Sequence, residues 1–135
     1  MDRLSSGELA KNCRVNLETI RYYERRGLLP KPPRNQSGYR LFSRDAVRRV
    51  RFIKRSQELG FSLREIKELL GLRIRPNTTC ADVRKQAETK IADIKAKIQG
   101  LRSMQQALER LTAACSGGGP ATECPILESL DPEED

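Results

Sequence analysis

The stretch SSGELAKNCRVNLETIRYYERRG, residues 5–27, carries the signals of two short helices separated by a turn. Ser5 and Glu8 have the spacing of a capping box, in which both side chains satisfy backbone N–H groups at the start of a helix. Asn16 is a favourable cap for a second helix, LETIRYYERR, which Gly27 ends. Two short helices joined across a turn of about four residues predict a helix-turn-helix.

The second of these helices has an inward and an outward face. Ile20 and Tyr23 have helical spacing and are expected to pack inward. The residues around them stay available outside, and together with the capping asparagine they are the candidate contacts to a partner surface: Asn16, Glu18, Thr19, Arg21, Tyr22 and Arg25.

The segment LLPKPPRNQSGYRLF, residues 28–42, is rich in proline and glycine and has a turn signal at Ser37-Gly38. It predicts a hairpin, the wing of a winged helix. A third helix is expected to open at Ser43 and to end at Gly60, because apolar residues recur between them at helical spacing.

A second capping box, formed by Ser62 and Glu65, predicts a fourth helix with the sequence SLREIKELLG. The loop LRIRPNTT, residues 72–79, is expected to follow. Thr79 is expected to cap the helix that comes next.

Residues 80–114 contain no proline and a single glycine, and they carry a heptad pattern. One series of positions at seven-residue intervals is apolar throughout, and its companion series is apolar at first and polar later: Ala87, Ile94, Leu101 and Leu108, with Ile91, Ile98, Gln105 and Thr112. A helix of this length spans about 50 Å at about 1.5 Å per residue, more than a 70-residue domain can cover. The pattern therefore predicts a coiled coil with a second chain, and hence a homodimer.

The charge of the chain, +8 in total, is concentrated in its first half. Residues 1–70 hold 17 Lys and Arg against 8 Asp and Glu, a balance of +9, while residues 71–135 hold 9 against 10, a balance of −1. A basic module of this kind indicates binding to nucleic acid phosphates. A solvated basic surface without a charged partner is the alternative.

The chain has four cysteines and no histidine. It has no apolar run long enough to span a membrane and no signal sequence at its start, so we expect a cytoplasmic protein without a membrane partner, where structural disulfides are rare. Cys13, at the turn of the helix-turn-helix, is read as a small core residue. The other three, Cys80, Cys115 and Cys124, are candidate metal ligands.

Cys80 and Cys115 stand at opposite ends of the predicted long helix, so one chain cannot bring both to one ion. If two such helices pair antiparallel, Cys80 of one chain meets Cys115 and Cys124 of the other, with the loop SGGGPATE turning the chain back and Pro125 starting a last short helix. Three thiolates without an imidazole favour soft metals: mercury(II) first, with lead(II), cadmium(II) and arsenite as further candidates. Ordinary buried thiols, or a reversible disulfide between Cys115 and Cys124, are the alternatives.

Two long stretches, VNLETIRYYERRGLLPKPPRNQSGYRLFS and VRFIKRSQELGFSLREIKELL, resemble the DNA-binding domain of the MerR family of bacterial transcriptional regulators. The resemblance covers residues 4 to about 71. The spacing of the three cysteines and the segment ECPILESL resemble the mercury-responsive members of that family. Zinc-sensing members typically carry a Cys-Cys pair and a histidine, which this chain lacks, and copper-sensing members lack the equivalent of Cys80; lead and cadmium sensors share much of the layout.

The resemblance implies a homodimer on double-stranded promoter DNA with an over-long spacer, repressing without metal. Mercury(II), or lead(II) or cadmium(II), would act as effector at the dimer ends, and the resulting distortion of the DNA would let RNA polymerase engage the promoter. By motif position, Thr19, Arg21 and Tyr22 would contact the major groove. The wing residues Gly38, Tyr39 and Arg40 would lie on the flanking backbone.

These observations predict a mainly α fold: a winged helix-turn-helix domain (1–71), a linker (72–79), a dimerisation helix in an antiparallel coiled coil (80–114), and a metal-binding loop, short helix and tail (115–135). An enzyme such as a thiol oxidoreductase is disfavoured, since the chain has no CxxC motif, no histidine base and no cofactor fingerprint. A constitutive architectural DNA-binding protein with incidental cysteines is a third possibility.

Overall fold

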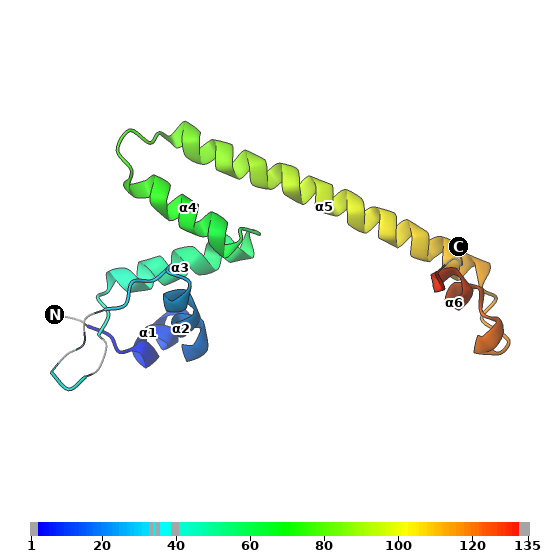
Figure 1. Ribbon diagram of the computed structural model, residues 1–135, viewed down its shortest axis with the longest axis horizontal. Coiled ribbons are helices and arrows are strands. Elements are labelled where there is room, and N and C mark those ends of the chain that lie inside the picture. The colour runs from blue at the N-terminus through cyan, green and yellow to red at the C-terminus, as the bar shows by residue number, and fades with distance from the viewer. Residues whose placement is uncertain (1–2, 33, 35, 39–40, 133–135) are drawn as a thin grey trace. The chain divides into compact units, whose positions relative to one another are not determined.

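A computed structural model describes residues 3–32, 34, 36–38 and 41–132 (Figure 1). The chain divides into two compact units, Met1–Lys90 and Ile91–Asp135. In chain order the helices are α1 (Ser6–Cys13), α2 (Leu17–Arg25), α3 (Asp45–Glu58), α4 (Leu63–Ile74), α5 (Cys80–Ala114), the short 3-10 helix η1 (Ala121–Glu123) and α6 (Pro125–Leu130). Within the described residues no β-strand forms, so the fold is mainly helical as the sequence predicts.

The predicted caps of α1 and α2 are confirmed. The Ser5 hydroxyl accepts from the Glu8 N–H at 3.1 Å while the Glu8 carboxylate accepts from the Ser5 N–H at 3.1 Å. Asn16 Oδ1 accepts from the Thr19 N–H at 2.8 Å. Arg14 closes α1 in the left-handed conformation, with φ of 56°. The chain therefore reverses tightly between the two helices, as a helix-turn-helix requires.

The described residues of the predicted wing form no strand. At its far end Phe42 pairs with Leu4 in an antiparallel bridge, with N···O distances of 2.8 and 2.6 Å. At its near end the guanidinium of Arg49 donates to the Leu28 carbonyl at 2.7 Å. Both ends of the segment are thus tied to the body of the first unit. Tyr39, in the middle of the predicted hairpin, lies outside the described residues.

The predicted start of the third helix at Ser43 is wrong by two residues. Helix α3 begins at Asp45, with Arg44 at the cap position and no side-chain cap. The bridge to Leu4 holds Phe42 in an extended conformation. The Ser43 carbonyl accepts a hydrogen bond from the Ala46 N–H at 3.0 Å and so forms a turn ahead of the helix. The serine therefore precedes the helix instead of capping it.

The fourth helix begins as predicted and runs further than predicted. The capping box of Ser62 and Glu65 is confirmed, with distances of 2.8 and 3.2 Å. Helix α4 continues to Ile74, although a loop was expected from residue 72. Nothing in 72–74 breaks a helix, and the chain leaves helical conformation only at Arg75, which precedes a proline and is extended (φ −73°, ψ 135°).

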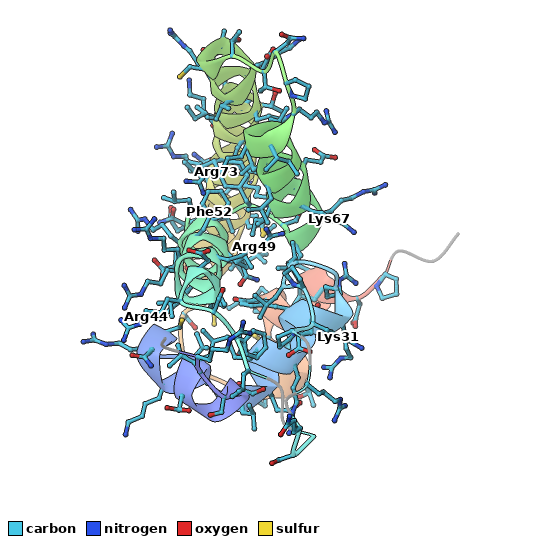
Figure 2. The ribbon with its side chains drawn as sticks, turned by 90° about the vertical axis from the view of Figure 1, so that its left-hand side faces the viewer. Lys31, Arg44, Arg49, Phe52, Lys67 and Arg73 are labelled. Atoms are coloured by element: carbon cyan, nitrogen blue, oxygen red, sulfur yellow. The ribbon has the colours of Figure 1, made fainter. Side chains whose placement is uncertain are left out.

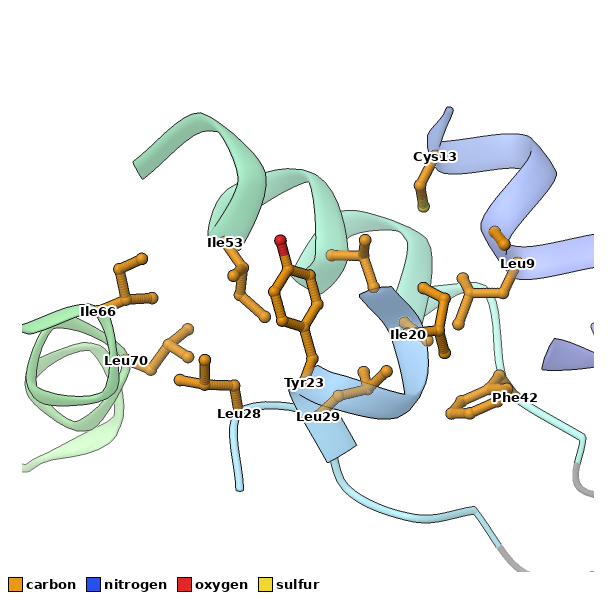
Figure 3. Packing of buried hydrophobic residues seen from close by; sticks show 13 residues of the cluster. Leu9, Cys13, Ile20, Tyr23, Leu28, Leu29, Phe42, Ile53, Ile66 and Leu70 are labelled. Atoms are coloured by element: carbon orange, nitrogen blue, oxygen red, sulfur yellow. The ribbon is translucent and has the colours of Figure 1, made fainter. Parts of the chain in front are cut away.

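The core of the first unit joins all four of its short helices (Figure 3). Ile20 and Tyr23 of α2 are buried in it as predicted, against Leu9 of α1 and Ile53 of α3. The Tyr23 ring lies against α3, and its hydroxyl donates to Gln57 Oε1 at 2.7 Å. The inward face of α2 is therefore fixed by apolar packing and by one partly buried hydrogen bond, which sets how its outer face is presented.

Helices α3 and α4 are also joined by a stacked cation. In Figure 2 Arg73 and Phe52 lie side by side, and the guanidinium carbon of Arg73 is 5.7 Å from the centre of the Phe52 ring. A cation over an aromatic face adds a modest attraction to the packing. It links the last turn of α4 to α3.

Candidate DNA-binding face and metal centre

The outer face of α2 presents the predicted mixture of charge and aromatic surface. Arg21 pairs with Glu18 at 3.4 Å, with both side chains exposed. The guanidinium of Arg25 lies 5.9 Å from the centre of the Tyr22 ring, and Tyr22 is 42% exposed. These four side chains therefore share one accessible face, with a cation–π pair that orients an arginine for contact.

The two remaining candidates at α2, Asn16 and Thr19, form hydrogen bonds with each other. Asn16 Oδ1 accepts from both the N–H and the hydroxyl of Thr19, each at 2.8 Å. This pair forms the cap of the helix, and Thr19 is half-buried. Their structural role is clear, and their role as direct contacts stays a prediction.

Of the wing candidates, Gly38 alone is described. It has φ of 85°, a conformation that favours glycine, and its carbonyl accepts from Arg34 at 3.0 Å. Tyr39 and Arg40 lie outside the described residues, so their placement in the wing stays a prediction.

A cluster of cations on α3 was not anticipated from the sequence. Arg51, Lys54 and Arg55 line a pocket of about 310 Å³ together with Arg14 from the turn between α1 and α2. Arg51 and Lys54 donate to the carbonyls at the end of α1, those of Asn12 and Arg14, each at 3.4 Å. The spacing of three cations at i, i+3 and i+4 is the sequence signal that could have identified this basic surface.

Cys13 is a core residue, as predicted. It is 4% exposed, and its thiol points to the Val47 carbonyl with a distance of 3.8 Å. Burial raises the pKa of this thiol, against an opposing effect of Arg51 and Lys54. Cys13 is therefore no candidate ligand.

Cys80 is the first residue of α5, and its side chain is exposed. The turn before it is held by Asp82, whose carboxylate accepts from the Thr79 N–H at 2.9 Å and from the Thr79 hydroxyl at 3.3 Å. Thr79 thus marks the start of the helix, as expected, although its side chain donates instead of accepting. These contacts cap the helix end at which Cys80 lies.

Cys115 and Cys124 lie together in the second unit. The Gly117 N–H donates to Cys115 Sγ at 3.4 Å. The pKa of Cys124 is lowered by the backbone N–H groups of Leu127 and Ile126 at the start of α6, and also by a hydrogen bond from the Cys115 thiol. The loop and the helix predicted at Pro125 therefore bring the two sulfurs together, and the lowered pKa makes Cys124 more acidic than an ordinary cysteine.

The loop between the two cysteines reverses direction at glycine residues. Gly117 and Gly119 have φ of 83° and 90°, values that a residue with a Cβ rarely adopts. The sharp reversal depends on these glycines. No group of three or more His, Cys, Asp or Glu side chains that could hold a metal ion exists among residues 3–32, 34, 36–38 and 41–132.

Helix α5 carries an exposed apolar stripe. The predicted heptad positions Ile94, Leu101 and Leu108 are 38%, 62% and 55% exposed. Apolar side chains at seven-residue intervals on one helix, left accessible in a single chain, are typical of a seam that pairs with another helix. None of the helices in the described part of the chain is both long and apolar enough to cross a membrane.

Two family models match the sequence over this architecture. Residues 4–72, which contain α1 to most of α4, match the model described as MerR HTH family regulatory protein, and residues 47–111 match the one described as MerR, DNA binding. The chain belongs to the MerR family. It is accordingly a DNA-binding transcription regulator and not an enzyme.

This MerR-family chain is similar to several characterised proteins. A mercuric resistance operon regulatory protein of Bacillus cereus is 48% identical over 124 residues, which is 92% of this chain and 94% of that protein. The dual function regulator MerR of Bacillus megaterium MB1, solved in complex with mercury(II), is 45% identical with a TM-score of 0.72, over 92% of this chain and 96% of that one.

The fold match extends to a relative solved with another metal. The transcription regulator PbrR691 of Ralstonia metallidurans CH34, in complex with lead(II), has a TM-score of 0.84 and 35% identity, over 95% of this chain and 99% of that one. The architecture of the MerR family is therefore present along almost the whole chain, and the family alone does not decide which metal this member binds.

Proposed function

We propose that this protein is a mercury(II)-responsive transcription regulator that binds promoter DNA as a homodimer. The observation that carries the proposal is the pair formed by Cys115 and Cys124, whose sulfurs are brought together by a glycine loop and a helix start. The similarity to mercuric resistance regulators supports the same reading.

The donor set available to a metal consists of thiols. Cys115 and Cys124 would supply two sulfurs, and Cys80 of the partner chain would supply the third. Mercury(II) is soft and accepts a purely sulfur environment, whereas structural zinc takes four ligands and catalytic zinc usually includes a histidine. Because the chain has no histidine, the residues present fit mercury(II) better than zinc.

The dimer would form along α5. An antiparallel pairing would cover the apolar stripe of Ile94, Leu101 and Leu108 and would place the start of one helix beside the end of the other. Each end of the dimer would then hold one metal site built from both chains.

Binding to promoter DNA would use the outer face of α2 and the wing. Arg21, Tyr22 and Arg25 have the chemistry for groove and phosphate contacts, and Glu18 is available beside them. Asn16 and Thr19 would support that face as its cap, with Gly38, Tyr39 and Arg40 on the flanking backbone.

We propose repression without metal and activation with it, acting on RNA polymerase at the promoter in the cytoplasm. Metal-dependent distortion of base pairs that the protein does not touch is a physically reasonable route to activation, because deforming DNA has an energy cost that depends on its sequence. Lead(II) is the second candidate effector, favoured by the likeness to the lead(II)-bound regulator, and cadmium(II) is a third.

A competitive metal titration tests the proposal. The full-length protein is titrated with mercury(II), lead(II), cadmium(II) and zinc(II) in excess small-molecule thiol, with the metal–thiolate absorption and proton release as readouts. We expect one mercury(II) per dimer end, and mercury(II)-dependent transcription from the cognate promoter. Retention of lead(II) or cadmium(II) in preference to mercury(II) would overturn the choice of metal, and DNA binding indifferent to all four would favour the architectural alternative.

A further inference from the structure

One charged side chain of α5 is buried. Lys90 lies ten residues after Cys80 on the same helix. Among the described residues of α5, Lys90 is the one that is buried. Its side chain is 9% exposed, in a helix whose other charged residues face solvent. Burying an ammonium group is unfavourable unless it is paired, so its partners matter.

Those partners lie at the corner between α3 and α4. The Lys90 Nζ is 2.8 Å from Glu65 Oε1 and 5.7 Å from the centre of the Phe61 ring. The same Glu65 oxygen accepts from the Ser62 N–H at 2.8 Å, as part of the capping box that begins α4. One carboxylate oxygen therefore joins the start of α4 to α5.

The contact has the properties of a rigid connection. Glu65 is 30% exposed, and its pKa is lowered to about 2, chiefly by the hydrogen bond from Lys90 and also by the Ser62 N–H, so it is ionised at neutral pH. A partly buried ion pair is screened by salt less than an exposed one, and removal of one partner weakens the stabilisation of the other charge. Any movement of α5 at Lys90 must carry the α3–α4 corner with it or break this pair.

Cys80 lies about 15 Å along α5 from Lys90, at about 1.5 Å per residue. We propose that Lys90 is the positioning residue that couples α5 to the helix-turn-helix and the helices α3 and α4. The effect of metal binding at Cys80 would then be transmitted to the α3–α4 corner through the ion pair with Glu65. This inference rests on the proposed function, because it assumes that a metal at Cys80 is the signal.

The main variant is Lys90→Met, which removes the charge and keeps a long side chain that tolerates burial. The matched control is Lys95→Met, at an exposed lysine of the same helix. Lys90→Arg tests rescue, because arginine keeps the charge and the donors. Each full-length variant is measured for mercury(II) affinity, for DNA affinity without metal, and for mercury(II)-dependent transcription and distortion of the promoter spacer.

We expect Lys90→Met to bind mercury(II) and DNA like the wild type. Its metal-dependent activation should be at least about fivefold weaker, which is the lower end of typical allosteric coupling. Lys95→Met should behave as wild type and Lys90→Arg should recover most of the activation. Full activation in Lys90→Met would overturn the proposal. So would a loss that Lys95→Met shares.

A second pair of variants separates coupling from stability. Glu65→Gln keeps an acceptor for the Ser62 N–H but removes the carboxylate that pairs with Lys90 at 2.8 Å, so it should reduce both stability and activation. Combining it with Lys90→Met removes both charges, which should restore stability while activation stays low. If activation recovers with stability, the ion pair is structural only and the proposal fails.

The wild type distinguishes this failure from that of the proposed function. A wild type that ignores mercury(II) would overturn the proposed function, and the coupling with it. A responsive wild type with a fully responsive Lys90→Met variant would overturn the coupling alone.

Discussion

The pKa of Cys124 is lowered by the backbone N–H groups of Leu127 and Ile126 and also by the side chain of Cys115, which lies across a loop whose reversal depends on Gly117 and Gly119. The two sulfurs come from opposite sides of that loop, one just after α5 and the other just before α6. Two of three expected ligands are thus assembled within one chain. The third, Cys80, opens a helix of 35 residues that ends before Cys115.

If the third ligand comes from the partner chain, defective subunits should complement each other. One subunit carries Cys80→Ser and the other carries Cys115→Ser with Cys124→Ser. Neither homodimer has three thiols at any site, whereas the heterodimer has one complete site and one empty end. We expect the heterodimer to bind one mercury(II) tightly in excess thiol, measured by the metal–thiolate absorption and by proton release.

Both parent homodimers serve as controls and should bind weakly. A heterodimer of confirmed mass that shows no gain over its parents would mean that the ligands come from one chain. The antiparallel arrangement would then be wrong.

A charge placed in the apolar stripe of α5 should separate the proposed dimer. Leu101→Glu would put an unpaired carboxylate into the seam, where its desolvation is unfavourable. We expect a monomer by analytical ultracentrifugation, with the helical signal of the first unit retained. Arg102→Glu, a charge change on the neighbouring position outside the heptad series, is the control and should remain dimeric. A Leu101→Glu dimer as stable as the wild type would show that the interface lies elsewhere.

The arginine that stacks on Tyr22 should contribute to DNA binding through phosphate charge. Arg25→Ala should weaken binding to all sequences and reduce the slope of log affinity against log salt by about one. Fluorescence anisotropy at several salt concentrations measures this slope, with Lys95→Ala on α5 as a control of equal charge change. A loss of preference at a single base pair with an unchanged slope would instead indicate direct base recognition by Arg25.

The Glu65 carboxylate predicts an acid-dependent loss of stability. Its pKa is about 2 in the folded protein against 4.5 for the unperturbed group, so between these values the unfolded state binds more protons than the folded state. The contribution of the ionised carboxylate to the free energy of unfolding is complete above about pH 4.5 and should decline as the pH falls toward 2. Urea denaturation at fixed protein concentration from pH 6 to about pH 2 should show a shallower decline in Glu65→Gln than in the wild type.

Glu68→Gln, at an exposed carboxylate one turn further along α4, is the matched control and should retain the wild-type decline. Equal declines in the wild type and Glu65→Gln would mean that the contact with Lys90 does not persist in solution.

The sequence predicted those features that depend on neighbours three or four residues apart. The capping boxes at Ser5 and Ser62 and the cap at Asn16 are local signals, and all three are present. The start of α6 at Pro125 was predicted for the same reason, since proline suits the first turn of a helix.

Features that depend on distant contacts were not predicted. Helix α3 starts two residues late because Phe42 pairs with Leu4, a partner 38 positions away. The burial of Lys90 likewise depends on Glu65, 25 positions earlier, and a lysine in a polar helix gives no local sign of such a partner. Of the predicted site, the pair Cys115 and Cys124 is brought together within the chain, while the proposed role of Cys80 depends on a second chain and stays a prediction.

The burial of Cys13 divides the four thiols of the protein into two kinetic classes. Cys80 is exposed and Cys115 and Cys124 are half-buried, so an alkylating reagent can reach them in the native state. Cys13 is 4% exposed and its pKa is raised, so we expect it to react much more slowly than the other three, and chiefly when the helix-turn-helix opens. If the other three thiols bind a metal as proposed and are thereby protected, slow alkylation of Cys13 in metal-saturated protein would report how often the helix-turn-helix opens under native conditions.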